Sequence, residues 1–172
     1  VPTTLAQDLP PLPGDLVVGD LPAPRGIAFD AAGNLIVAVA GTGGEVGVTM
    51  PGPEGEQSIQ MGLTGRILSV APDGTASDWI GGLPSYASAS EVTGVYRAIP
   101  QGDSLWVVFN GTGSATVGAF WTDTVVELDA ATLAVKTIIN LNAFESENDP
   151  DGAGYDSNVS DIAWGADGTL YI

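Results

Sequence analysis

An acidic segment near the end of the chain, residues 145–158, contains the side chains best suited to chemistry. Its sequence is ESENDPDGAGYDSN, so carboxylates recur at alternate positions and can turn inward on a single loop. Gly152 permits the sharp bend that such a loop needs, and hard oxygen ligands at this density suit Ca²⁺. The segment predicts a calcium-binding loop, with these candidate metal ligands: Glu147, Asp149, Asp151, Asp156 and Asn158.

This loop departs from the EF-hand pattern at both of its ends. Glu147 stands at the first position, which is normally Asp, and Asn158 stands at the twelfth, which normally supplies a bidentate Glu. No helical pattern flanks the segment. Two interpretations are open: a modified calcium loop, and a solvated acidic loop whose Asp and Asn side chains stabilise turns.

Composition removes several other kinds of site. The 172-residue chain contains no histidine and no cysteine. A Ser-His-Asp triad, an imidazole base, a zinc thiolate site and a thiol nucleophile are therefore excluded within it. Carboxylates, hydroxyls, the lone Lys136 and three arginines remain for chemistry.

The charge balance limits the partners. The chain has 4 Lys and Arg against 21 Asp and Glu, a formal net charge of -17, which repels nucleic acid and anionic lipid. No apolar run approaches the roughly 18 residues that a membrane-spanning helix needs. We expect no membrane insertion. The acidic excess has two open interpretations: the carboxylates only keep an exported protein soluble, or they bind cationic partners or divalent metal ions.

The elements that would position these residues are β-hairpins that resemble one another. Residues 26–37 (GIAFDAAGNLIV) align without gaps to residues 161–172 (DIAWGADGTLYI), and residues 97–108 (RAIPQGDSLWVV) are similar. Each segment has two short apolar runs around a turn that contains Gly, which is typical of a β-hairpin. A second pair of predicted strands follows two of them, at residues 65–84 and 123–141.

The predicted unit is therefore four antiparallel strands, and two units occupy residues 26–84 and 93–141. Four-stranded units repeated along a chain are typical of β-propeller blades, so the sequence predicts an all-β propeller. Val17 and Val18 match the fourth strand of a unit and are expected to complete the last blade of a ring. Residues 159–172 begin a further blade, and residues 1–15 form a Pro-rich extended leader.

About two and a half blades are thus expected in residues 16–172, whereas a closed propeller typically has four to eight. An open ring would expose strand edges and an apolar blade face. We expect the chain to be a piece of a longer polypeptide; the alternative is that several copies assemble to close the ring. A first residue that is not Met fits a mature terminus after export.

Two Gly-rich insertions are further candidates for recognition. Residues 40–57 and 110–120 follow equivalent hairpins and are expected on the same rim of the propeller. The first lacks a Gly-Lys-Ser/Thr motif and carries three glutamates, so it is unsuited to binding phosphate. Trp121, which adjoins the second insertion, is a candidate for an exposed contact. The other three tryptophans lie in predicted strands and are expected to pack between blades: Trp79, Trp106 and Trp164.

Motifs in a characteristic order resemble a known family. LPAPRGIAFDAAGNLIVAVAGTGG is followed by PGPEG, GLTGRILSV, GGLPS and NDPDGAGYDSN. In this order they resemble the ScyD/ScyE family of exported β-propeller proteins, first associated with the gene cluster for the pigment scytonemin. The resemblance covers residues 21–172 but is loose over residues 92–123. It implies export and a propeller fold, and the family has no securely attached enzymatic activity.

The sequence therefore predicts an exported, non-enzymatic β-propeller that serves as a binding or structural module at the cell surface or in a larger assembly. Its expected partners are proteins or the rest of its own propeller, with Ca²⁺ ordering residues 145–158. The alternative is a metal-dependent hydrolase or lactonase with a carboxylate-ringed metal in the central channel. That site needs an acidic residue where the first strand of each blade begins. Only Asp161 meets this requirement, because Arg25 and Arg97 occupy the equivalent positions of the other two blades. We expect both arginines to pair with carboxylates.

Overall fold

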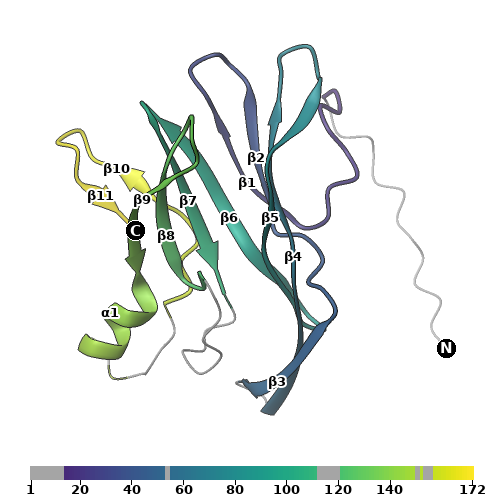
Figure 1. The fold of residues 1–172 in the computed structure, drawn as a ribbon, viewed down its shortest axis with the longest axis vertical. Coiled ribbons are helices and arrows are strands. Elements are labelled where there is room, and N and C mark those ends of the chain that lie inside the picture. Colours follow the sequence, from purple (N-terminus) through teal and green to yellow (C-terminus); the bar gives the residue numbers. More distant parts are fainter. Residues whose placement is uncertain (1–13, 53–54, 112–120, 150–151, 153–156) are drawn as a thin grey trace.

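The computed structural model describes residues 14–52, 55–111, 121–149, 152 and 157–172, and it is an all-β fold with one short helix in this part of the chain (Figure 1). The prediction of an antiparallel all-β protein is confirmed. The elements are β1 (Pro24–Phe29), β2 (Leu35–Val39), β3 (Val46–Gly52), β4 (Gly55–Val70), β5 (Ala76–Ala87), β6 (Val92–Gln101), β7 (Ser104–Asn110), β8 (Thr124–Asp129), β9 (Val135–Asn140), α1 (Leu141–Asn148), β10 (Ala163–Trp164) and β11 (Leu170–Tyr171).

Nine strands form one open antiparallel sheet. Its order is β1-β2-β4-β5-β6-β7-β8-β9, β3 pairs with β4 at one edge, and β10 and β11 form a separate hairpin. We call β1, β2, β4 and β5 the first group, and β6 to β9 the second group. Separate four-stranded units were expected, but β5 pairs with β6 at Ser85–Gly94, Tyr86–Thr93 and Ala87–Val92. The two groups are therefore continuous, and neither sheet is closed.

Central strands of both groups are buried on both faces, which explains their uninterrupted apolar sequences. In β2, Ile36 and Ala38 point to one face, while Val37 and Val39 point to the other. In β7, Leu105 and Val107 share a face with Phe109, and Val108 points away from them. Each group must therefore be covered on two sides.

The main core lies between the two groups, because the sheet folds so that one group packs on the other. The second face of the first group packs against Val18 and Leu21 from the N-terminal segment. The second face of the second group packs against the hairpin β10–β11 through Val159, Ile162 and Trp164. Figure 1 shows the first group, the second group and β10–β11 as successive layers across the molecule.

Three hairpin turns with similar sequences share one hydrogen-bond pattern. In residues 30–34 (DAAGN), Asp30 N–H donates to Asn34 O, and Gly33 N–H donates to Asp30 O. The same two bonds close residues 71–75 (APDGT) and 165–169 (GADGT). The glycine in the fourth position of each turn has a φ of +83°, +86° and +84° in chain order, in the left-handed region that Gly tolerates. Local sequence thus sets these turns.

The first strands of the two groups, β1 and β6, lie against each other at Gly26. A Cβ at this position would meet the Arg97 side chain and would lie 2.5 Å from the backbone oxygen of Tyr96. Only a residue without a side chain permits this close approach of two strands. Gly26 therefore fixes the spacing between the first and second groups.

Two local expectations differ from the structure. Residues 141–148 form the helix α1, although no helical pattern was expected beside the acidic segment. Asn140 begins α1 as its N-cap, since its side-chain oxygen accepts from Ala143 N–H at 2.9 Å. Val17 and Val18 lie in a bend rather than in a strand.

Candidate functional site

The predicted calcium ligands are placed only in part by the structure. Glu147 is exposed near the end of α1, and Asp149 is the C-cap of that helix, with its N–H bonded to Glu145 O at 2.7 Å. Asn158 is exposed in a left-handed conformation with φ +42°. Asp151 and Asp156 lie outside the described residues, so the structure does not bring the five ligands together or separate them.

A pocket of about 360 Å³ lies between α1 and the segment that leads to β10. Its lining residues include the acidic Glu145 and Asp161, the polar Asn158, and the apolar Leu141 and Phe144. Glu145 Oε2 accepts a hydrogen bond from Ser157 Oγ at 2.6 Å, which ties α1 to this segment. The pocket is mixed in character, with acidic and apolar sides.

A buried polar cluster adjoins this region, and we call it the Asp123 cluster (Asn110, Thr122, Asp123, Asn142 and Glu145). Asp123 is fully buried just before β8, and its Oδ1 accepts from Gly111 N–H at 3.3 Å. Asn142, in the first turn of α1, donates to the Thr122 backbone oxygen at 3.3 Å and to its hydroxyl at 3.2 Å. Asn110 donates to the backbone oxygen of Val159 at 3.0 Å.

Two oxygens of this cluster have no hydrogen-bond partner although they are buried: Asp123 Oδ2 and Asn142 Oδ1. Burial raises the pKa of Asp123 above its ordinary value, and the negative charge of Glu145 adds to the rise. Gly111 N–H, the Asn142 side chain and Val159 N–H act in the opposite direction. Of these three groups, only Gly111 N–H forms a hydrogen bond with the Asp123 carboxylate. The loss of water around this buried carboxylate is therefore only partly offset.

Sequence reasoning did not single out the Asp123 cluster. Its one signal is the polar run Thr122-Asp123-Thr124, which leads into the apolar residues of β8. Asp123 also has φ +47°, an uncommon conformation for a residue other than Gly. The sequence alone does not reveal that α1 and residues 157–159 cover this carboxylate.

Both arginines of the first strands pair with carboxylates, as expected. Arg25 lies 3.4 Å from Glu91 Oε1, donates to Val92 O and stacks over the Tyr96 ring at 4.6 Å from the centroid. Arg97 Nε donates to Asp161 Oδ1 at 2.8 Å, and its Nη1 donates to Ile27 O at 2.8 Å. Arg97 thus connects β1, β6 and the segment before β10.

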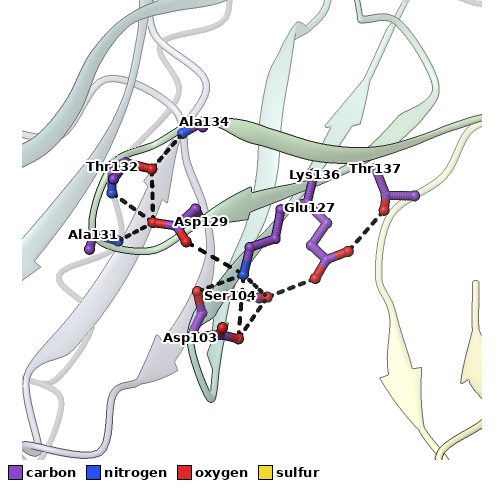
Figure 2. A network of polar contacts seen from close by, with 9 residues as sticks. All are labelled: Asp103, Ser104, Glu127, Asp129, Ala131, Thr132, Ala134, Lys136 and Thr137. Atoms are coloured by element: carbon purple, nitrogen blue, oxygen red, sulfur yellow. Dashed lines mark hydrogen bonds and ion pairs between the residues drawn. The ribbon is translucent and has the colours of Figure 1, made fainter.

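The lone lysine stabilises the turns at one end of the second group (Figure 2). Lys136 Nζ donates to the backbone oxygen of Asp103 and to Ser104 Oγ, both at 3.1 Å, and it lies 3.7 Å from Asp129 Oδ2. Ser104 Oγ in turn donates to Glu127 Oε1 at 2.7 Å. Because its three N–H donors face these acceptors, Lys136 is a structural residue rather than a nucleophile.

The four tryptophans are all partly buried. Trp79, Trp106 and Trp164 lie in β5, β7 and β10, as predicted, and Trp106 meets Trp164 edge to face with 5.6 Å between ring centroids. Trp121, predicted as the candidate for an exposed contact, packs against Phe109 with 5.1 Å between ring centroids. It therefore contributes to the main core.

The first Gly-rich insertion, residues 40–57, is mostly a hairpin that extends the sheet. β3 pairs with the beginning of β4, and Ile59 and Tyr86 form a small core with Val48 and Met61. Residues 112–120 of the second insertion lie outside the described residues. The structure therefore does not test whether the two insertions share a rim.

No helix in the part of the chain that the structure describes is long and apolar enough to cross a membrane. The same described residues contain no group of three or more Asp, Glu, His or Cys side chains arranged to hold a metal. Comparisons with protein-family models, with curated proteins and with solved structures give no match. The chain's own residues are therefore the basis for its proposed function.

Proposed function

We propose that this chain forms consecutive blades of an exported, non-enzymatic β-propeller that acts as a binding or structural module at the cell surface or in a larger assembly. The first group would be one blade, the second group the next, and β10–β11 the beginning of a third. The resemblance to the ScyD/ScyE family supports both export and the propeller.

The observation that carries this proposal is the packing of the two groups. Each group has four neighbouring strands, and its central strands are buried on both faces, as expected for blades between neighbouring blades. β1 and β6, the first strands, lie against each other at Gly26, and Arg97 connects them to Asp161. In a propeller, the first strand of each blade lies innermost, so the ion pair of Arg97 and Asp161 would face the central channel.

The proposed partners are proteins, or further blades that complete the ring. A net charge of -17 favours partners with a basic contact surface. The exposed apolar side chains Ile27 and Phe29 lie on β1, an edge strand, and are suited to contact such partners or blades.

Enzymatic activity of the hydrolase or lactonase type is the less supported alternative. A channel metal requires carboxylates that are free to bind it at the first strands, but these positions hold Arg25 and Arg97, each paired with an acid. Asp161 is the acidic residue in such a place, and it accepts from Arg97. The charges of Arg25, Arg97 and Asp161 are thus balanced by ion pairs within the protein.

Calcium binding by the loop that contains Glu147, Asp149 and Asn158 remains part of the proposal. It is supported by the carboxylate spacing of the sequence. An Asp149→Ala, Asp151→Ala double variant is expected to lose any calcium-dependent rise in unfolding temperature that depends on this loop. An unchanged rise would remove the loop from the proposal.

Cell fractionation combined with intact mass tests the proposed function. The native protein is expected outside the cytoplasm, in a covalent chain larger than the 17.4 kDa of these residues or in a stable assembly of copies. A cytoplasmic monomer of 17.4 kDa would contradict the proposal. So would hydrolysis of lactones or esters that an Asp161→Asn variant abolishes.

A further inference from the structure

The Asp123 carboxylate is a buried negative charge that the fold does not neutralise. The side chain of Asp123 is 0% exposed and that of Asn142 is 8% exposed. One oxygen of each, Asp123 Oδ2 and Asn142 Oδ1, lacks a hydrogen-bond partner. Buried charges in proteins are normally paired or coordinate a metal ion, and an unpaired one costs several kcal/mol.

No side chain of the protein supplies the missing positive charge. The chain has 4 Lys and Arg and no His, and all of the basic side chains are engaged elsewhere. Arg25 pairs with Glu91, Arg66 with Asp78, Arg97 with Asp161, and Lys136 with Asp103 and Asp129. The charge of an ionised Asp123 is therefore compensated from solution, by a proton or by a bound cation.

A second carboxylate lies close enough to add to this negative potential. Glu145, one helical turn after Asn142 on α1, is half-buried, and its charge raises the pKa of Asp123. Glu145 also lines the pocket of about 360 Å³ between α1 and residues 157–161, so this member of the site borders a cavity. Two carboxylates and a free amide oxygen are hard donors, the type that Ca²⁺ and Mg²⁺ prefer.

We propose that Asp123, Asn142 and Glu145 form a binding site for a hard divalent cation, of which Ca²⁺ fits the flexible oxygen donor set best. The site differs from the loop of Glu147, Asp149 and Asn158, with which it shares no ligand. The bound cation neutralises the buried charge and fastens α1 to the beginning of β8.

Thermal unfolding with and without divalent cation tests this site. Millimolar CaCl₂ is expected to raise the unfolding temperature of the chain above its value in EGTA with NaCl of equal ionic strength. Asp123→Asn is expected to lose the part of this rise that depends on the Asp123 site. It should also unfold at a higher temperature than the unsubstituted chain in EGTA, because the buried charge is gone. The matched control is Asp20→Asn, the same exchange at an exposed residue that also has positive φ (+55°), and it should keep the rise.

Helix α1 supplies a second pair of variants in case Asp123→Asn does not fold. Glu145→Gln is expected to weaken Ca²⁺ binding measured by calorimetry. It should also reduce Tb³⁺ luminescence sensitised by Tyr96, which packs against the core cluster that contains Val125 and Val159. Glu45→Gln, the same exchange at an exposed glutamate outside both α1 and the acidic loop, should leave both signals unchanged. The proposal is overturned if Ca²⁺ and Mg²⁺ have no effect on the unsubstituted chain, or if Asp123→Asn and Glu145→Gln both retain the response. Loss of response in Glu147→Gln alone would place the cation in the loop instead.

Discussion

Several acidic side chains of this protein have a local structural task. Asp30 Oδ1 accepts from Ala32 N–H at 2.9 Å and from Asn34 N–H at 2.8 Å. Asp73 and Asp167 each accept from the N–H of the Thr two residues later, at 2.9 and 3.0 Å. These hydrogen bonds favour the ionised carboxylates, so the pKa of each lies below its ordinary value of 3.8. Part of the large acidic excess therefore stabilises turns.

We expect these turns to lose stability in acid. As the pH falls, the unfolded chain takes up protons near 3.8 while the folded carboxylates stay ionised, so the stabilisation is full above that pH and declines below it. An Asp30→Asn, Asp73→Asn, Asp167→Asn triple variant keeps an accepting oxygen in each turn but cannot titrate. Urea unfolding from neutral to acidic pH should give a flatter profile for the variant; equal slopes would contradict this account.

Tyr86 gives the corresponding prediction at alkaline pH. Burial raises its pKa to about 12 from the ordinary 10.0. Between these values the unfolded chain releases the phenolic proton and the folded chain keeps it, so stability falls as the pH rises. Ultraviolet titration should show this delayed ionisation, and Tyr86→Phe should reduce the alkaline loss of stability. Ionisation of all tyrosines near 10 would show that Tyr86 is solvated.

At the scale of elements, local sequence patterns predict the β-hairpins but not how one hairpin pairs with the next. Turn sequences such as APDGT and the apolar runs beside them specify strands and turns over short distances. The pairing of β5 with β6 was missed because β5 extends beyond Gly82 to Ala87, in a segment that resembles a polar connection. The eight-residue helix α1 was missed because so short a helix depends on its cap and on packing more than on composition.

The Asp123 cluster was unpredictable for a related reason. Its members come from the end of β7, the beginning of β8, and α1. Which carboxylate among 21 acidic residues becomes buried depends on how these distant segments pack. By contrast, the arginine pairs were predictable, because so few cations among so many acids must find partners.

Gly26 tests the contact between the two groups. Gly26→Ala is expected to cost about 1–3 kcal/mol of unfolding free energy, because the new methyl group would collide with the β6 backbone. Gly81→Ala is the matched control in β5, where a Cβ meets nothing within 4 Å, and its cost should stay within about 0.5 kcal/mol. Chemical denaturation measures both. Equal effects would mean that β1 and β6 do not touch.

The cap of α1 is a second test at this scale. Asn140→Ala removes the oxygen that accepts from Ala143 N–H and should cost about 1 kcal/mol. Asn140→Ser should restore most of it, because a serine hydroxyl can cap the same N–H. Since α1 carries Asn142 and Glu145, the Ala variant should also weaken the response to Ca²⁺. A variant as stable as the unsubstituted chain would argue against the cap.

At the scale of the whole molecule, the net charge of -17 opposes compaction. Each of the four basic side chains forms an ion pair with a nearby carboxylate. Most of the 21 carboxylates have no such partner and repel one another across the surface. We expect the unfolding temperature to rise as NaCl increases from low to physiological ionic strength, because salt screens this repulsion. Calorimetry at several NaCl concentrations measures the effect. A fall in unfolding temperature would show that the ion pairs outweigh the repulsion.

At the scale of the whole molecule, the two four-stranded groups pack on each other and their central strands are buried on both faces. This packing is the central reason for proposing a propeller. A crystal structure of the native polypeptide, grown with CaCl₂, is the most direct test. We predict that β1, β6 and the strand beginning near Ile162 surround a common axis. A further four-stranded unit that includes Val17 and Val18 should cover the face of Val37, Val39, Leu68 and Val70, on which Val18 packs. A sheet that closes into a barrel, or first strands that point away from one another, would contradict the propeller and the function proposed from it.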